Sequence, residues 1–408
     1  MGEHAFTTPD LTRVGAERAG VVVPMTERSI VEAAERLRRH GEPYLVATVV
    51  CITGTAYRNP GARMILTRFR WVAGSVSGGC LEGDLSEKGW LRTRDGNPVV
   101  FTYDATTSVD NDDDIRSAFG LGCDGTVEVL LERAGTSGRI DALEFASRCL
   151  RASKRGAMST VFHSTDPAIR VGARLAIAAG GELEQEADPL GATVRAAIDA
   201  DMRGVIELGR SANRRYETAN GAIEVLIEAV LPPPRLFLCG TGHDAVPVAT
   251  LARAMGWDVI VCASDAKYST RERFSMADEV LIGAPRELAA RIAQSDRAIA
   301  VVMNHDRDRD RESLQLLLGT QLRYIGVIGP RSRTQRLLRE LEVDDEDPRV
   351  IAPAGLQLGA ESPQELALAI IGEAQAVLAG TPMADIRQRL TPTVMAPAID
   401  AGFAVAAR

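Results

Sequence analysis

The chain has 408 residues, 45% hydrophobic and 25% charged, with a formal net charge of −8. These values are typical of a soluble protein with two or three domains. The negative charge and an aromatic content of only 4% argue against a nucleic-acid binder, which neutralises phosphates and stacks bases, and no apolar run reaches membrane-spanning length.

Residues 1–25 carry acidic side chains and lack an apolar core, so they predict a flexible tail rather than a secretory signal. The cysteines show no CxxC spacing, which indicates reduced thiols in a cytoplasmic protein. Four of them lie in apolar patterns and are interpreted as core residues: Cys51, Cys149, Cys239 and Cys262.

Residues 26–135 predict an α+β domain. Apolar residues at helical spacing, including Ile30 and Leu37, predict a first helix that ends before Gly41. The valine-rich run over 44–52 predicts a buried strand. Further strands are expected at 64–66, from 71 towards the turn that contains Cys80, at 99–103 and at 126–131, and a helix at 81–92.

Two thiols of this domain lie in glycine-dense turns. Cys80 lies in Gly74-Ser-Val-Ser-Gly-Gly-Cys-Leu-Glu-Gly-Asp84, and Cys123 lies in Gly120-Leu-Gly-Cys-Asp-Gly125. Glycine lets the backbone approach a ligand, and a thiolate attacks, binds soft atoms or carries sulfur. Because Cys80 directly precedes a predicted helix, the helix dipole would favour its thiolate and attract an anion. The two turns indicate sulfur chemistry or a bulky anionic ligand.

Charged residues near these turns have two interpretations. Arg58 and Arg63 flank the Pro60-Gly61 turn and would form an electropositive cradle for the Cys80 loop. The acidic run over 110–114 lacks the glycine and glutamate spacing of a calcium loop, so we interpret it as solvated and predict no metal site.

Residues 136–231 predict an α+β segment that packs with the N-terminal unit. A helix is expected near 140–152, a strand near 159–162, and a hairpin at Asn220-Gly221 that leads into a strand over 222–230. The three prolines at 232–234 predict a stiff connector and a domain boundary.

Residues 235–380 alternate between strand and helix patterns, which predicts a Rossmann-like, doubly wound parallel sheet. The last helix is indicated by Ser362-Pro-Gln-Glu365, which combines an N-cap, an N1 proline and a capping-box glutamate. Residues 381–408 are expected to be a tail. The strands are expected at 235–239, 258–262, 279–282, 298–303, 324–328 and 349–352.

A glycine turn follows the first of these strands. Gly240-x-Gly242-x-x-Ala245 matches the dinucleotide-binding fingerprint, in which glycines let a pyrophosphate approach a helix N-terminus. The alternative is a turn that serves only helix–sheet packing. Asp265, the acid expected to reach a ribose, lies about three residues late, so NAD, NADP and other nucleotides stay open as ligands.

Further polar residues lie on the edge where such sheets bind ligands. His243 is either an acid–base group near phosphates or a helix-capping histidine. His305 ends the fourth strand, and the charged residues that follow it also suit a solvated helix start. In Gly329-Pro-Arg-Ser-Arg333, the guanidiniums of Arg331 and Arg333 and the hydroxyl of Ser332 are either anion ligands or solvated surface groups.

Together these motifs resemble the xanthine dehydrogenase accessory family, XdhC/CoxI, over roughly 26–132 and 235–380. The resemblance is carried by several motifs in the same order: Pro60-Gly-Ala-Arg-Met64, Val76-Ser-Gly-Gly-Cys-Leu-Glu82, Gly120-Leu-Gly-Cys123, Leu238-Cys-Gly-Thr-Gly-His-Asp-Ala245, His305-Asp306, Tyr324-Ile-Gly-Val-Ile-Gly329 and Pro353-Ala-Gly-Leu-Gln-Leu-Gly-Ala360. Two departures are Asp124, where the family usually has glycine, and Gln357, where it often carries an acid.

The resemblance implies a chaperone for the molybdenum cofactor. Such proteins bind the molybdopterin-type cofactor, work with a cysteine desulfurase that supplies the terminal sulfido ligand, and deliver the product to a molybdenum hydroxylase apoenzyme of the xanthine or carbon monoxide dehydrogenase type. Family members are commonly homodimers. The thiols would hold the dithiolene–metal centre or relay a persulfide.

This interpretation assigns chemical roles to Cys80, Cys123 and His243. The cofactor-binding residues it predicts are Arg63, Gly78, Gly79, Glu82, Gly240, Gly242, His243, Ala245, Asp265, His305 and Arg331. An NAD(P)-dependent oxidoreductase with His243 or His305 as proton donor is the main alternative. A third hypothesis is an adaptor that holds desulfurase and apoenzyme together without a ligand.

Overall fold

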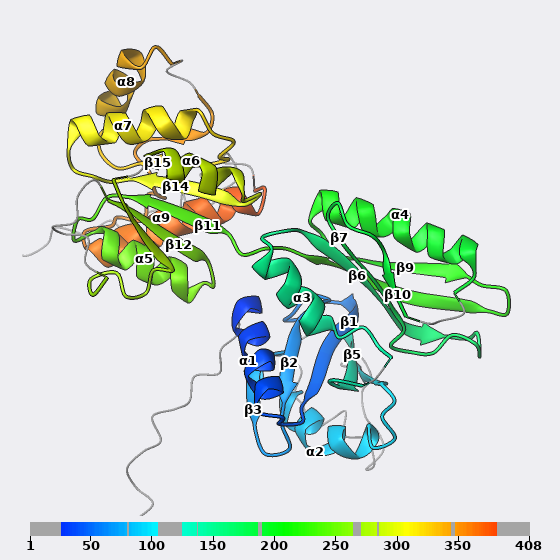
Figure 1. Ribbon diagram of the computed structural model, residues 1–408. Coiled ribbons are helices and arrows are strands. Elements are labelled where there is room, and N and C mark those ends of the chain that lie inside the picture. Colours follow the sequence, from blue (N-terminus) through cyan, green and yellow to red (C-terminus); the bar gives the residue numbers. More distant parts are fainter. Residues whose placement is uncertain are drawn as a thin grey trace, which may run out of the picture. The chain divides into compact units, whose positions relative to one another are not determined.

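The computed structural model describes residues 26–79, 81–104, 125–136, 138–186, 190–263, 271–283, 285–343 and 347–381 (Figure 1). The chain divides into two compact units, Met1–Leu231 and Pro232–Arg408. The predicted connector over 232–234 lies at the start of the second unit.

The N-terminal unit contains two antiparallel five-stranded sheets. The first has the order β3-β2-β1-β5-β4, and the valine-rich run forms its central strand. Its strands are β1 (Leu45–Gly54), β2 (Arg63–Leu66), β3 (Trp71–Gly74), β4 (Val99–Asp104) and β5 (Gly125–Arg133). The second sheet has the order β8-β7-β6-β10-β9. Its strands are β6 (Gly156–Ser164), β7 (Arg174–Ala178), β8 (Glu184–Gln185), β9 (Ala212–Glu217) and β10 (Ala222–Val230).

Helices cover these sheets with their apolar faces. Thr26 caps α1 (Glu27–Arg39) by accepting a hydrogen bond from the Ser29 amide, and Asp141 caps α3 (Ala142–Arg151) in the same way. The buried faces of α1 and α3 share one core with residues of both sheets. The second sheet packs against α4 (Ala192–Leu208), which runs along it in Figure 1.

The second unit is a six-stranded parallel sheet with the order β13-β12-β11-β14-β15-β16. Its strands are β11 (Arg235–Cys239), β12 (Asp258–Ala263), β13 (Glu279–Ile282), β14 (Ala298–Val302), β15 (Ile325–Val327) and β16 (Val350–Ile351). The strand order reverses between β11 and β14. This arrangement confirms the predicted Rossmann-like fold, whose ligands bind where the order reverses, outside the carboxyl ends of the strands.

Helices lie on both faces of the parallel sheet. The core on one face includes residues of α5 (Ala245–Ala254) and α9 (Pro363–Leu378). The core on the other face includes residues of α6 (Pro285–Ala293), α7 (Arg307–Leu318) and α8 (Arg331–Glu340). The predicted capping box is confirmed, because Ser362 and Glu365 exchange hydrogen bonds at the start of α9.

Candidate functional site

A buried carboxylate organises the loop that leads to Cys80. Glu82, only 4% exposed, opens α2 (Glu82–Arg92). Its carboxylate accepts hydrogen bonds from the Ser75 hydroxyl at 2.8 Å, from the Val76 and Ser77 amides at 3.1 and 2.8 Å, and from the Ser77 hydroxyl. Burial acts to raise the pKa of Glu82, but the hydrogen bonds from Ser77 and Ser75 outweigh it and lower that pKa. The predicted ligand Glu82 therefore serves the loop itself.

The same loop leaves its glycines accessible. The Ser77 hydroxyl accepts hydrogen bonds from the amides of Gly79 and Leu81, both at 3.1 Å. Gly78 and Gly79 are exposed, and Gly79 has φ +118°, a conformation that favours glycine. A Cβ on Gly78 would lie 3.8 Å from the ring of Tyr57, which is 72% exposed.

The described residues on either side of 105–124, the range that contains Cys123, make specific contacts. At its start, Tyr103 on β4 donates a hydrogen bond of 2.8 Å to buried Asp84 on α2. At its end, Gly125 pairs with Gly54, and a Cβ on Gly125 would lie 2.4 Å from the Thr53 carbonyl oxygen. Only glycine fits this close approach.

Described residues of the two predicted thiol turns therefore lie next to the same short stretch of chain, residues 53–57. Gly125 contacts the backbone of Thr53 and Thr55, and Gly78 faces Tyr57. Cys80 and Cys123 themselves lie outside the described residues, so their roles stay predictions. The described residues near them in the sequence make contacts among α2, β4, β5 and the connection after β1.

A pocket of about 370 Å³ lies beside Tyr57 in the N-terminal unit. Its walls include Arg58, whose guanidinium lies 5.8 Å from the centre of the Tyr57 ring. The pocket is lined by Glu27, Tyr57, Arg58, Asn59, Pro60, Gly61, Ala62, Arg63, Ser211, Glu228, Ala229 and Val230.

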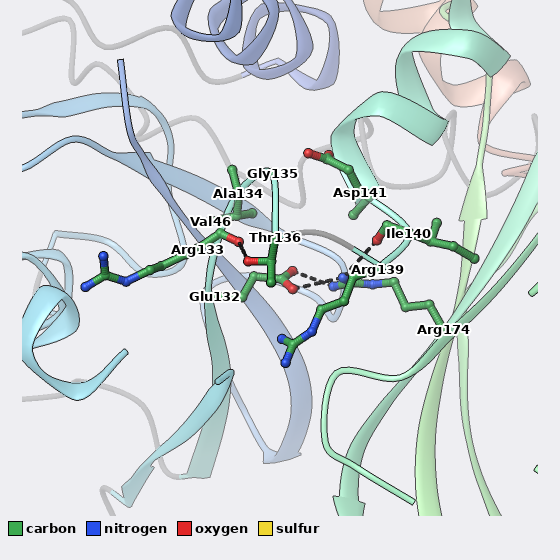
Figure 2. Close-up of a pocket in the computed structure, with 11 residues that line it drawn as sticks. Val46, Glu132, Arg133, Ala134, Gly135, Thr136, Arg139, Ile140, Asp141 and Arg174 are labelled. Atoms are coloured by element: carbon green, nitrogen blue, oxygen red, sulfur yellow. Dashed lines mark hydrogen bonds and ion pairs between the residues drawn. The ribbon is translucent and has the colours of Figure 1, made fainter. Parts of the chain in front are cut away.

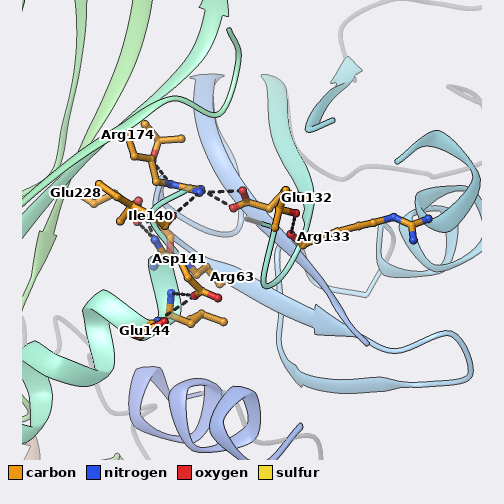
Figure 3. Close-up of polar contacts among 12 residues, drawn as sticks. Arg63, Glu132, Arg133, Ile140, Asp141, Glu144, Arg174 and Glu228 are labelled. Atoms are coloured by element: carbon orange, nitrogen blue, oxygen red, sulfur yellow. Dashed lines mark hydrogen bonds and ion pairs between the residues drawn. The ribbon is translucent and has the colours of Figure 1, made fainter. Parts of the chain in front are cut away.

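Two buried ion pairs join the sheets of this unit. Arg174 on β7 contacts Glu132 on β5 through both terminal guanidinium nitrogens at 2.9 and 2.5 Å, and Figure 2 shows this contact among the residues that line a small pocket. Arg63 on β2 contacts both carboxylate oxygens of Glu228 on β10 at 2.7 and 2.8 Å (Figure 3). Arg63 was predicted to bind a cofactor, but its guanidinium has a buried carboxylate partner.

The glycine turn of the second unit has the geometry that the fingerprint predicts. Gly240 follows β11 with φ +139°, and a Cβ there would lie 2.3 Å from the Met303 carbonyl oxygen. Ala245 is the buried first residue of α5. The turn after β11 thus packs directly against the turn after β14, at the point where the strand order reverses.

The structure brings His305 to the same turn. Its Nε2 lies 3.6 Å from Asp244 Oδ2, and its ring would meet a Cβ on Gly242 at 3.1 Å. His305 has φ +58°, which is strained for a side chain other than glycine. His243 is exposed in the same turn.

The other residues predicted to bind a ligand at the carboxyl edge of the parallel sheet have different surroundings. Asp265 lies outside the described residues. Arg331 is exposed at the first position of α8, whereas Arg333 pairs at 2.6 Å with Asp310, a buried carboxylate that also accepts hydrogen bonds from Asn304. Asp310 therefore links the turn after β14 to α8.

Sequence reasoning missed several residues that hold these sites. The contact between Asp84 and Tyr103 could not be predicted from a local pattern, because the two residues lie 19 positions apart on different elements. Tyr57 could have been found from the sequence, because a large aromatic side chain in a polar turn is unusual.

Within the described ranges, no group of three or more histidine, cysteine or acidic side chains could hold a metal ion. No helix in those same ranges combines the length and apolar character needed to cross a membrane.

Comparisons with known proteins agree with this architecture. A family model described as the XdhC Rossmann domain matches residues 236–374, and one described as the XdhC and CoxI family matches residues 37–104. A Bacillus subtilis protein described as a probable xanthine dehydrogenase subunit is 29% identical over 332 residues, which covers 81% of this chain and 92% of that protein. The uncharacterized protein YqeB from Escherichia coli is 31% identical over 157 residues, 38% of this chain and 29% of that protein.

A solved structure extends the comparison to the fold. The crystal structure of a xanthine dehydrogenase from Bacillus halodurans has a TM-score of 0.68 and 25% identity, and the match covers 88% of this chain and 98% of that one. The fold and the site thus define a mixed α/β protein with a thiol-bearing N-terminal unit and a Rossmann unit. The chain belongs to the XdhC/CoxI family.

Proposed function

We propose that this protein is an accessory factor that binds the molybdenum cofactor as cargo and supports its sulfuration and insertion into a xanthine dehydrogenase-type enzyme. Family membership and the relatives named as xanthine dehydrogenase components support the enzyme class. The observation that supports the site is that Gly78 and Gly125, which belong to the two thiol turns, lie next to Tyr57 and Thr55.

The residues of the N-terminal unit suit such a cargo. A molybdopterin has a flat ring system, a phosphate and a sulfur-bound metal. Tyr57 offers an exposed ring for stacking, and Arg58 offers a positive charge for the phosphate. Exposed Gly78 and Gly79 permit close approach of the backbone, and the thiols of Cys80 and Cys123 would contact the sulfur-bound metal.

Cofactor retention tests this proposal. The purified protein is mixed with molybdenum cofactor released from a donor enzyme, passed through a desalting column and assayed for molybdenum and pterin. We expect near-stoichiometric retention by the wild type and at least a tenfold loss of affinity in Cys80→Ala and Cys123→Ala. Cys149→Ala is the matched control, because Cys149 is buried in the core around α1 and α3. Equal retention by all four proteins would contradict the thiol assignment.

The partners of the proposed function are a cysteine desulfurase and the apoenzyme, with the protein acting as a cytoplasmic homodimer. Co-purification with each tagged partner tests the first two, and sedimentation of the purified chain tests the dimer. Partner binding that survives both cysteine substitutions, without cofactor retention, would favour an adaptor instead.

The glycine turn favours a second candidate, an NAD(P)-dependent oxidoreductase. Gly240, Gly242 and His305 lie together at the point where the strand order reverses, the usual place for a dinucleotide. A titration with NADH and NADPH, followed by nicotinamide fluorescence, tests it. Saturable binding with hydride turnover would support this candidate, and the absence of binding would remove it.

A further inference from the structure

Two cysteines interpreted as separate core residues lie side by side. Cys239 ends β11 and Cys262 lies on β12, and the two are direct partners in the parallel register. Side chains at paired positions of neighbouring parallel strands point to the same face of the sheet. Both thiols accordingly belong to the core on the α6, α7 and α8 face. The two thiols also share a hydrogen bond, and the pKa of Cys262 is raised first by that hydrogen bond and then by burial.

The spacing of the strands suits a covalent link. Neighbouring strands lie about 4.8 Å apart, and the Cα atoms of a disulfide lie about 4.4–6.8 Å apart. The other free cysteines in the described part of the chain, Cys51 and Cys149, lie on β1 and α3. Neither is a register partner of another cysteine.

A pocket of about 250 Å³ at the carboxyl edge of the sheet borders the thiol pair. Cys239 and Cys262 form part of its wall, and Cys262 is only partly buried. Helix α7 also lines this pocket, with the polar residues Arg309, Glu312 and Ser313. A small polar oxidant in this pocket would therefore lie next to both cysteine residues.

We propose that Cys239 and Cys262 form a redox-active dithiol that a small hydroperoxide oxidises to an intramolecular disulfide. One thiol attacks the peroxide, the O–O bond breaks, and an alcohol or water leaves with formation of a sulfenic acid. The second thiol displaces the sulfenic oxygen as water, and the S–S bond forms. Two thiols and one hydroperoxide thus give one disulfide, one alcohol or water and a further water. The thiols lose two electrons, and the peroxide gains them.

The link would form directly beneath the glycine turn. Gly240 follows Cys239, and its amide donates a hydrogen bond of 3.1 Å to the Cys262 carbonyl oxygen. The Met303 amide donates one of 2.8 Å to the Cys239 carbonyl oxygen. Oxidation would therefore tie together the strand ends that position Gly240 and the turn after β14. This inference is independent of the cofactor proposal, which concerns the N-terminal unit.

Thiol counting with peptide mapping tests the inference. The full chain carrying Cys80→Ser and Cys123→Ser is reduced, freed of reductant, treated with hydrogen peroxide, blocked with N-ethylmaleimide and digested without reduction. We expect a peptide linked through Cys239 and Cys262, about 2 Da lighter than the two free peptides, and a loss of two titratable thiols that dithiothreitol reverses.

Matched variants distinguish a disulfide between Cys239 and Cys262 from oxidation of other cysteines. Cys51→Ser and Cys149→Ser in the same background should each still lose two thiols, whereas Cys239→Ser and Cys262→Ser should lose none to a reversible internal link. Absence of the linked peptide from the oxidised background protein would overturn the inference without reference to any variant. A link between other cysteines, or an equal reversible loss in Cys239→Ser, would also overturn it.

Discussion

Arg63 and Glu228 lie 165 positions apart in the sequence and form an ion pair between the two sheets of the N-terminal unit, in which one guanidinium nitrogen donates to both carboxylate oxygens. Both side chains are nearly inaccessible to solvent, at 5% and 4% exposure. The pair Arg174–Glu132 reverses the arrangement, since here the second sheet supplies the arginine and the first sheet the glutamate. In both pairs, a buried charge on one sheet has its partner on the other sheet. The two ion pairs thus fix how the sheets pack.

Removing one member of such a pair should therefore destabilise the unit strongly. We expect Glu228→Ala to cost about 3–5 kcal/mol, because it leaves the Arg63 guanidinium buried without its carboxylate. Urea unfolding monitored by hydrogen exchange of β2 and β10 measures this cost. The control is Glu32→Ala, which breaks the more exposed Arg28–Glu32 pair and should change stability by less than about 0.5 kcal/mol.

A double variant distinguishes the charge from the packing. Arg63→Met combined with Glu228→Leu should recover most of the lost stability, because hydrophobic side chains of similar volume often replace a buried ion pair at little cost. A double variant as unstable as Glu228→Ala would show that the ion pair itself, rather than the unpaired charge, decides the stability.

The Glu82 carboxylate should make the Cys80 loop sensitive to acid. Its pKa is lowered in the folded protein from the ordinary 4.5, so below that value the unfolded chain binds more protons than the folded one. The stabilisation by ionised Glu82 is present above about pH 4.5 and is lost as the pH falls through the lowered pKa. We expect the stability difference between wild type and Glu82→Gln to shrink between pH 6 and pH 3 in urea titrations. A constant difference would contradict this role.

Local patterns were sufficient to predict much of the fold. The valine-rich β1 and the capping box of α9 appear where the sequence indicates them, because burial and capping act through neighbouring residues. By contrast, α4 was not predicted: its N-cap Gly191 makes no side-chain hydrogen bond, and it buries only Ile198, Met202 and Val205. The edge strand β9 is polar and shows no alternation that would distinguish it from a loop.

Contacts between distant residues could not be predicted in this way. The sequence favoured Arg63 as a ligand group, because nothing local reveals its pairing with Glu228. Cys239 and Cys262 each fit a core pattern, and only the register between β11 and β12 makes them neighbours. The meeting of the glycine turn with His305 followed from the fold class, since both lie at carboxyl ends of adjacent strands.

The strained backbone of His305 should be measurable. His305→Ala and His305→Gly both remove the imidazole and its contact with Asp244, but only glycine tolerates φ +58° without strain. We expect the glycine variant to be more stable than the alanine variant by about 1 kcal/mol, measured by urea unfolding. Equal stabilities would mean that the turn relaxes when the imidazole is removed.

Asp310 should be the most sensitive acid at the carboxyl edge of the parallel sheet. It is 1% exposed, accepts hydrogen bonds from the amide and side chain of Asn304 at 3.1 Å, and pairs with Arg333 at 2.6 Å. Asp310→Ala leaves these donors without an acceptor, so we expect a loss of about 3 kcal/mol and faster hydrogen exchange in the turn after β14. Asp308→Ala is the matched control, because Asp308 lies exposed in the same first turn of α7. If both variants lose equal stability, the effect comes from the helix dipole, which both carboxylates share, and not from the bridge between Asn304 and Arg333.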